Sequence, residues 1–323
     1  MGDIFGLVIV RPFGIVLMAI FNAVHSYGLA VMLFALLIKL ILIPLGVKSK
    51  KNMMSMTAMN AEMQAIQKKY ANNRVKMNEE VQKLYDKHGV NPMTGCLPQF
   101  IQLPIMMGLY YAVQQPMKFM LGFGQDVIDA LAVKVGIDTA TAGYYGQITI
   151  IDKLSQLIDA NGNFPADIMK IVEGTSGTLV PINFTFLGLN LAEIPSIKHF
   201  GIMWLIPILS GATAFLSSFI MQKMQGNNTA VQQNGSMKAM MMMMPLMSVY
   251  FGFILPGTIG IYWILNNVLT CLQEIILTRH FRKKQQLKES EAAAELEREK
   301  QQKKEKQREL NAEQNAKKKK GEK

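Results

Sequence analysis

The sequence predicts an all-α polytopic membrane protein with five transmembrane helices, and three observations support this class. Half of the 323 residues are hydrophobic. These residues gather in long apolar windows, whose units are long enough to cross a bilayer at about 20 residues per helix. The charged residues, 34 basic and 23 acidic, lie mostly between the windows. A soluble globular protein mixes these kinds of residue more evenly along the chain.

The apolar windows divide into five predicted spans, because Pro256-Gly257 interrupts the last window. The spans are 28–47, 97–115, 201–221, 239–255 and 258–278. An odd number of spans places the two termini on opposite sides of the membrane.

The charges of the connecting segments predict the orientation, because Lys and Arg near span ends are retained in the cytoplasm. Segment 48–94 has nine basic and four acidic residues, a net charge of +5. Segment 116–200 has a net charge of −3, and the tail 279–323 has a net charge of +7. The short segment 222–238 adds two lysines. We therefore expect 48–94, 222–238 and the tail in the cytoplasm, and the N-terminus and 116–200 outside.

Residues 1–27 predict a helix that lies in the outer membrane interface. The stretch 4–24 is apolar but is interrupted by Arg11-Pro12, and the uninterrupted part 13–24 is too short to span a bilayer. A tilted sixth span is the alternative. The lack of a basic leader argues against a cleaved signal peptide.

Segment 48–94 predicts a cytoplasmic helical hairpin. Apolar residues recur at helical spacing over 56–70, and a weaker stripe follows over 78–88. Ala71-Asn72-Asn73 separates the two arms. By contrast, segment 116–200 mixes Gly, Asp and Thr clusters with short apolar runs, which indicates a small subdomain outside the membrane.

Lys39 lies near the middle of the first span, where a charge costs several kcal/mol unless it reaches water or a partner. It is roughly 12 Å from the inner end at 1.5 Å per residue, a distance that its side chain covers only in part. Extension toward the inner surface is one interpretation. A polar cavity reached from the cytoplasm is the other.

Polar side chains recur on one face of the fifth span, and weaker polar faces occur on spans two and three. We expect these faces to line the cavity around Lys39. The alternative is that they only form hydrogen bonds between helices. The predicted cavity residues are Lys39, Gln102, Thr213, Ser217, Trp263, Asn266, Asn267 and Thr270.

The sequence contains no Gly-rich phosphate loop, metal-spaced His/Cys set or nucleophile elbow. Its two cysteines, Cys96 and Cys271, provide neither a disulfide framework nor a zinc site. A Ser/Lys dyad that uses Lys39 lacks any feature that fixes its geometry. We therefore expect no enzymatic activity, no cofactor and no DNA partner.

Short motifs follow one another in a characteristic order between residues 13 and 281. They include Tyr27-Gly28-Leu29-Ala30, Gly95-Cys96-Leu97-Pro98, Gln102-Leu103-Pro104-Ile105, Ile206-Pro207-Ile208-Leu209-Ser210-Gly211 and Gly260-Ile261-Tyr262-Trp263. This order resembles the YidC-type membrane protein insertases. The resemblance implies five core helices around a hydrophilic groove that is open to the cytoplasm and the lipid and closed outside. It also implies that Lys39, where the family more usually has Arg, attracts acidic segments of incoming proteins.

The resemblance further implies that the protein resides in a bacterial plasma membrane and moves hydrophobic segments of newly made proteins into the bilayer. The implied partners are nascent membrane proteins, membrane lipids and the ribosome, with the general secretion translocon left open. Tail residues that would contact ribosomal RNA phosphates are Arg282, Lys283, Lys284, Lys317, Lys318, Lys319 and Lys320. These charges could instead only fix the topology.

Two other functions stay open at this point. A small secondary transporter or channel could use Lys39 as a substrate site, although the odd span number and the lack of a recognisable inverted repeat argue against it. A scaffold that only assembles other membrane complexes would have neither activity.

Overall fold

The computed structural model describes residues 3–91, 93–198, 200–225, 235–283 and 287. These residues are mainly helical, with one antiparallel two-stranded ribbon of β1 (Thr185–Phe186) and β2 (Leu189–Asn190). The chain divides into two compact units, Met1–Glu274 and Ile275–Lys323.

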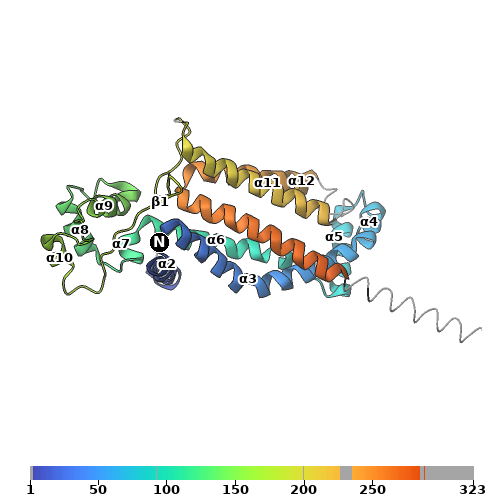
Figure 1. Ribbon diagram of the computed structural model, residues 1–323. Coiled ribbons are helices and arrows are strands. Elements are labelled where there is room, and N and C mark those ends of the chain that lie inside the picture. The colour runs from blue at the N-terminus through green and yellow to red at the C-terminus, as the bar shows by residue number, and fades with distance from the viewer. Residues whose placement is uncertain (1–2, 92, 199, 226–234, 284–286, 288–323) are drawn as a thin grey trace, which may run out of the picture. The chain divides into compact units, whose positions relative to one another are not determined.

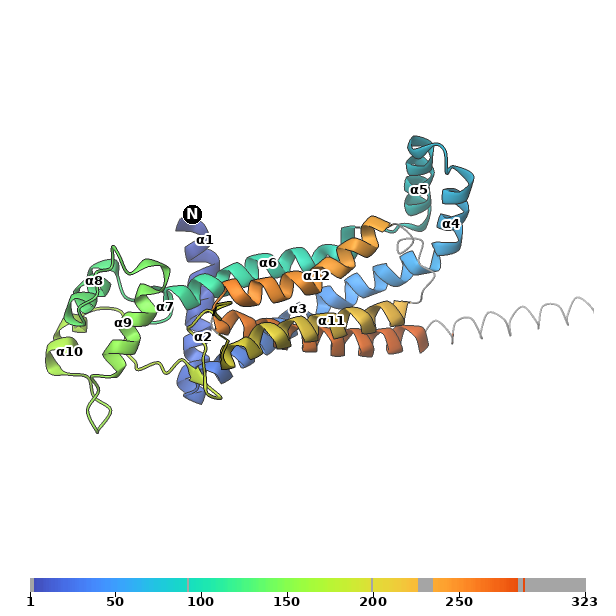
Figure 2. The ribbon, with the colours of Figure 1, turned by 90° about the horizontal axis from the view of Figure 1, so that it is seen from above.

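Within the described residues, five helices besides the N-terminal helix have 20 or more residues. They are α3 (Tyr27–Ala58), α6 (Met93–Gln114), α11 (Leu205–Gln225), α12 (Gly235–Ile254) and the helix Gly257–Lys283, which we call the last helix. Figures 1 and 2 show α3, α6, α11 and α12 running alongside one another. Among these four, α3 packs against α6 and α11 packs against α12.

Four helices of the described residues are long and apolar enough to cross a membrane. They are Gly6–Val24, Tyr27–Ala58, Ile202–Met224 and Gly257–Lys283. The helix α3 continues well past position 47, where the first predicted span ends. Hydropathy marks where the hydrocarbon region ends, and the lysines and methionines that follow are good helix formers, so the helix itself continues.

The N-terminal helix is longer than the stretch 13–24. It consists of α1 (Asp3–Phe5), a π-helical turn (Gly6–Val10) and α2 (Arg11–Val24), and it ends at His25, which has a left-handed φ of 52°. Pro12 stands in the first turn of α2, just after the wider π turn, where the missing N–H and the ring are tolerated. Figures 1 and 2 show this helix lying across α3 and α6 and not along them.

Two helices follow α3 in the segment that predicts a hairpin, α4 (Asn60–Lys69) and α5 (Arg74–His88). The Asn73 side chain accepts a hydrogen bond from the Lys76 backbone N–H at 3.0 Å and so begins α5. Gly89, with a φ of 60°, ends it. The pair has a small core of its own, made of Met59, Met63, Leu84 and Val90.

An ion pair network also joins the two hairpin helices. Glu62 of α4 lies 3.2 Å from the Lys87 ammonium and 3.3 Å from the His88 ring nitrogen of α5. The hydrogen bond from Lys87 lowers the pKa of the Glu62 carboxyl. Since this side chain is exposed, the pair contributes little stability.

Short helices make up segment 116–200. They are α7 (Pro116–Phe119), α8 (Gln125–Lys134), a 3₁₀ turn (Gly143–Tyr145), α9 (Gly146–Ser155) and α10 (Ala166–Val172). Their buried apolar side chains belong to the same core as those of α2, α3 and α6. This subdomain and the α4–α5 hairpin lie at opposite ends of the helices in Figure 2.

Buried side chains gather at the end of the helices that carries segment 116–200. In α3 they occur over 27–35, whereas no residue of 36–48 is buried. In the last helix they occur over 257–262, whereas none of 263–274 is buried. In α11 they occur over 206–211 and not over 212–224. The helices are therefore packed tightly at the end that carries segment 116–200. Beyond it fewer side chains are covered by protein, although Ser49 and Lys50 of α3 are buried again.

Candidate functional site

Lys39 contacts the last helix. Its ammonium donates a hydrogen bond to the Thr270 hydroxyl at 2.7 Å, and that hydroxyl donates to the Asn266 backbone oxygen at 2.6 Å. Because the Thr270 proton is used in this way, the oxygen has its lone pairs free to accept from Lys39. The ion pairs found among the described residues do not include Lys39. Its hydrogen-bond partner is thus a neutral hydroxyl, and the carboxylate that acts on its charge from nearby is that of Glu274.

A second polar set joins α11 to the last helix. Ser217 donates from its hydroxyl to the Asn267 backbone oxygen at 3.1 Å. The Asn267 amide donates to the Thr213 hydroxyl at 3.4 Å and to the Ser210 backbone oxygen at 3.5 Å. Such contacts are the hydrogen bonds between helices that the sequence left as an alternative, and they fix the rotation of the last helix against α11.

The two remaining predicted residues also lie against this helix or on it. The Gln102 amide of α6 donates to the Tyr262 hydroxyl at 2.8 Å. The Trp263 ring packs on Phe251 of α12, with the ring centres 5.6 Å apart. The eight predicted cavity residues therefore form three sets around one helix. Each set includes a contact to a different neighbour, so the last helix organises all of them.

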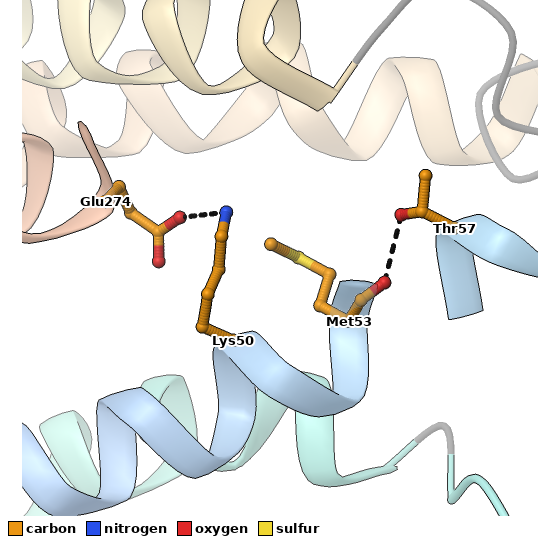
Figure 3. A network of polar contacts seen from close by, with 4 residues as sticks. All are labelled: Lys50, Met53, Thr57 and Glu274. Atoms are coloured by element: carbon orange, nitrogen blue, oxygen red, sulfur yellow. Dashed lines mark hydrogen bonds and ion pairs between the residues drawn. The ribbon is translucent and has the colours of Figure 1, made fainter. Parts of the chain in front are cut away.

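Sequence reasoning missed a further pair. Lys50 of α3 and Glu274 of the last helix lie 2.6 Å apart, with side-chain exposures of only 3% and 16%. Figure 3 shows Lys50 reaching toward Glu274, while the Thr57 hydroxyl donates to the Met53 backbone oxygen at 2.9 Å farther along. From the sequence, Lys50 is only one of the basic residues of segment 48–94. Glu274 could have indicated the pair, because an acidic residue in an apolar span requires a partner.

The same two helices approach closely between these contacts. A side chain at Gly46 would overlap the Gln273 amide. Because this amide is the far end of a flexible side chain, it could move aside for a small side chain at Gly46.

The predicted tail contacts fall in the second unit. Arg282 and Lys283 belong to the end of the last helix, and Lys284 and Lys317 to Lys320 lie outside the described residues. As for metals, the described part of the chain contains no group of three or more His, Cys, Asp or Glu residues that could hold an ion.

Comparisons with known proteins give a consistent result. A family model described as "60Kd inner membrane protein" matches residues 19–286, which include every residue of the polar contacts described above. The chain is 27% identical to "Membrane protein insertase YidC 2" of Listeria innocua over 84% of this chain and 70% of that protein. It is 27% identical to "Membrane protein insertase YidC" of Alkalihalophilus pseudofirmus over 86% and 82%. It is also 26% identical to "ALBINO3-like protein 1, chloroplastic" of Arabidopsis thaliana over 82% and 46%.

Proposed function

Because the chain belongs to the 60Kd inner membrane protein family, which includes the YidC-type insertases, we propose that it moves hydrophobic segments of new proteins into the lipid bilayer. It acts as a multi-pass membrane chaperone and not as an enzyme. Its substrates are nascent membrane proteins.

The observation that carries this proposal is the setting of Lys39. A cation whose hydrogen bond goes to a neutral hydroxyl, in a stretch of α3 where no residue of 36–48 is buried, can attract an acidic segment of an incoming protein. We propose that α3, α6, α11, α12 and the last helix cross the membrane and enclose a water-filled groove around Lys39. The tightly packed end closes the groove on the outside.

The orientation follows from the alternating charges of the connecting segments. The α4–α5 hairpin and the tail lie in the cytoplasm, and segment 116–200 lies outside. The N-terminal helix lies in the outer interface, which agrees with its course across α3 and α6. The basic tail docks the ribosome, and the general secretion translocon is a further candidate partner.

Insertion then proceeds without a chemical step. The polar flank of a nascent segment moves from the cytoplasm into the groove, where water and one fixed cation replace part of the roughly 30 Å of hydrocarbon that it would otherwise cross. The apolar part slides past α11 and the last helix into lipid. Transfer of apolar surface out of water, at about 25 cal/mol per Å², drives this movement.

Purified protein in liposomes tests the proposal. Two single-span substrates are used, which differ only in two flank residues: Glu in the acidic-flank substrate and Gln in the neutral-flank substrate. Protease protection of the flank measures insertion without any solute gradient. We expect both substrates to insert faster than into protein-free liposomes. Equal rates with and without the protein would contradict the proposal, and gradient-dependent uptake of a solute would favour a transporter.

A further inference from the structure

The proposed function makes no use of the buried ion pair between Lys50 and Glu274. Lys50 follows Lys39 by about three helical turns, so both lysines lie on the same face of α3. Glu274 follows Thr270 by about one turn on the last helix. The contacts Lys39–Thr270 and Lys50–Glu274 therefore join the same two helices. The two lysines are about 16 Å apart along α3, but their partners are only about 6 Å apart along the last helix, so the lysine side chains converge.

Stability alone is a weak explanation for this pair. Removal of two charges from water offsets most of their attraction, and apolar side chains of similar size often hold helices together equally well. An ion pair, unlike an apolar contact, allows one carboxylate partner to be exchanged for another. Any carboxylate that reaches Lys50 can replace that of Glu274 and satisfy the same ammonium group.

We propose that Lys50 is a docking site for the carboxylates of an acidic substrate flank, and that Glu274 is the exchangeable carboxylate that occupies this site between substrates. The inference rests on the proposed function. Lys50 stays paired throughout the exchange, so no buried charge is left without a partner. The site precedes Lys39 on the path from the end of α3 that we place in the cytoplasm.

The displaced Glu274 also explains why docking does not trap the flank. Its carboxylate remains close to the newly docked one, and two like charges repel each other. The flank is therefore held only weakly at Lys50. Lys39, whose ammonium makes its hydrogen bond to a neutral hydroxyl, is a cation farther along α3, and it too is attracted by the Glu274 carboxylate. When the flank moves on, Glu274 returns to Lys50.

The experiment measures the ratio of initial insertion rates, acidic-flank over neutral-flank substrate, in the liposome assay. In Glu274→Gln the competing carboxylate is absent, so the ratio should rise. In the double variant Lys50→Met/Glu274→Leu the docking site is absent and the helices keep an apolar contact, so the ratio should fall. Each change should reach about fivefold, the factor expected for two unit charges about 4 Å apart even in bulk water.

Lys51→Met is the matched control, because Lys51 is the exposed neighbour of Lys50 on α3 and loses the same charge. Its ratio should stay that of the wild type. If the ion pair only holds α3 and the last helix together, Glu274→Gln slows the insertion of both substrates equally. All ratios then stay unchanged, which overturns the inference. If Glu274→Gln does not fold, the ratio of the double variant decides the question alone. Insertion of the neutral-flank substrate by the wild type tests the proposed function separately.

Discussion

Neutralising Lys39 should slow the insertion of acidic flanks selectively. Lys39→Met removes the ammonium and keeps a side chain of similar length, so packing changes little. A flank carboxylate about 4 Å from the ammonium is attracted by about 1 kcal/mol in bulk water and by about 4 kcal/mol at an effective dielectric constant near 20. The water-filled groove that we propose around Lys39 places the site nearer the wet limit.

We therefore expect the acidic-to-neutral rate ratio to fall about tenfold in Lys39→Met, which corresponds to about 1.4 kcal/mol in the barrier. In Lys39→Glu, attraction becomes repulsion of similar size, so the ratio should fall by about the square of that factor. Lys39→Arg keeps the charge and should keep the ratio.

Thr270→Val is the control for the hydrogen bond. It removes the hydroxyl that accepts from Lys39 and leaves the charge and the side-chain shape unchanged. Because we attribute the effect to charge, the ratio should be unaffected, even if the loss of a neutral hydrogen bond lowers stability by about 1 kcal/mol. All variants are compared at equal amounts of folded protein. An equal rate ratio in the wild type and in Lys39→Glu would refute the reasoning.

Three further predictions concern topology, the tail and packing. In a cysteine-free background, an impermeant thiol reagent added to intact cells should label Asn161→Cys and not Ser55→Cys; both positions are exposed, and labelling of Ser55→Cys would reverse the topology. Truncation after Lys284 should weaken ribosome co-sedimentation at low salt, and an unchanged amount would exclude docking by the tail. Gly14→Ala should lower stability by about 1–3 kcal/mol, since its Cβ would overlap the Phe119 carbonyl; an unchanged melting temperature would contradict this close approach.

The helical class and the likeness to the insertases could be predicted because they depend on local patterns. Apolar runs predicted where the long helices lie, and the family match over 19–286 confirms the predicted resemblance. Helix ends were less predictable. The N-terminal helix continues through Arg11-Pro12 because a π turn relieves the strain of the proline, and hydropathy does not report such a turn.

The partners of individual polar residues could not be predicted, since they depend on how distant helices pack. A polar face on the last helix was apparent, but Lys39 and Thr270 are separated by 231 positions in sequence. Glu274 of the last helix pairs with Lys50, which α3 carries into the bundle because the helix continues past the predicted end of the span.

The uneven burial along the helices has a mechanical consequence. Helices that are held together at one end move most at the other. The apolar core that α2, α3, α6 and segment 116–200 share holds these helices together, and we call it the clamp. Amide hydrogens should exchange slowly near the clamp and faster toward Lys39 within the same helix. The opposite ends are joined by the Lys50–Glu274 ion pair, so they can separate to admit segments of different bulk only when this pair opens, while the core stays folded. One bundle thus combines a rigid foundation with an adaptable opening, and no hinge loop is needed between them.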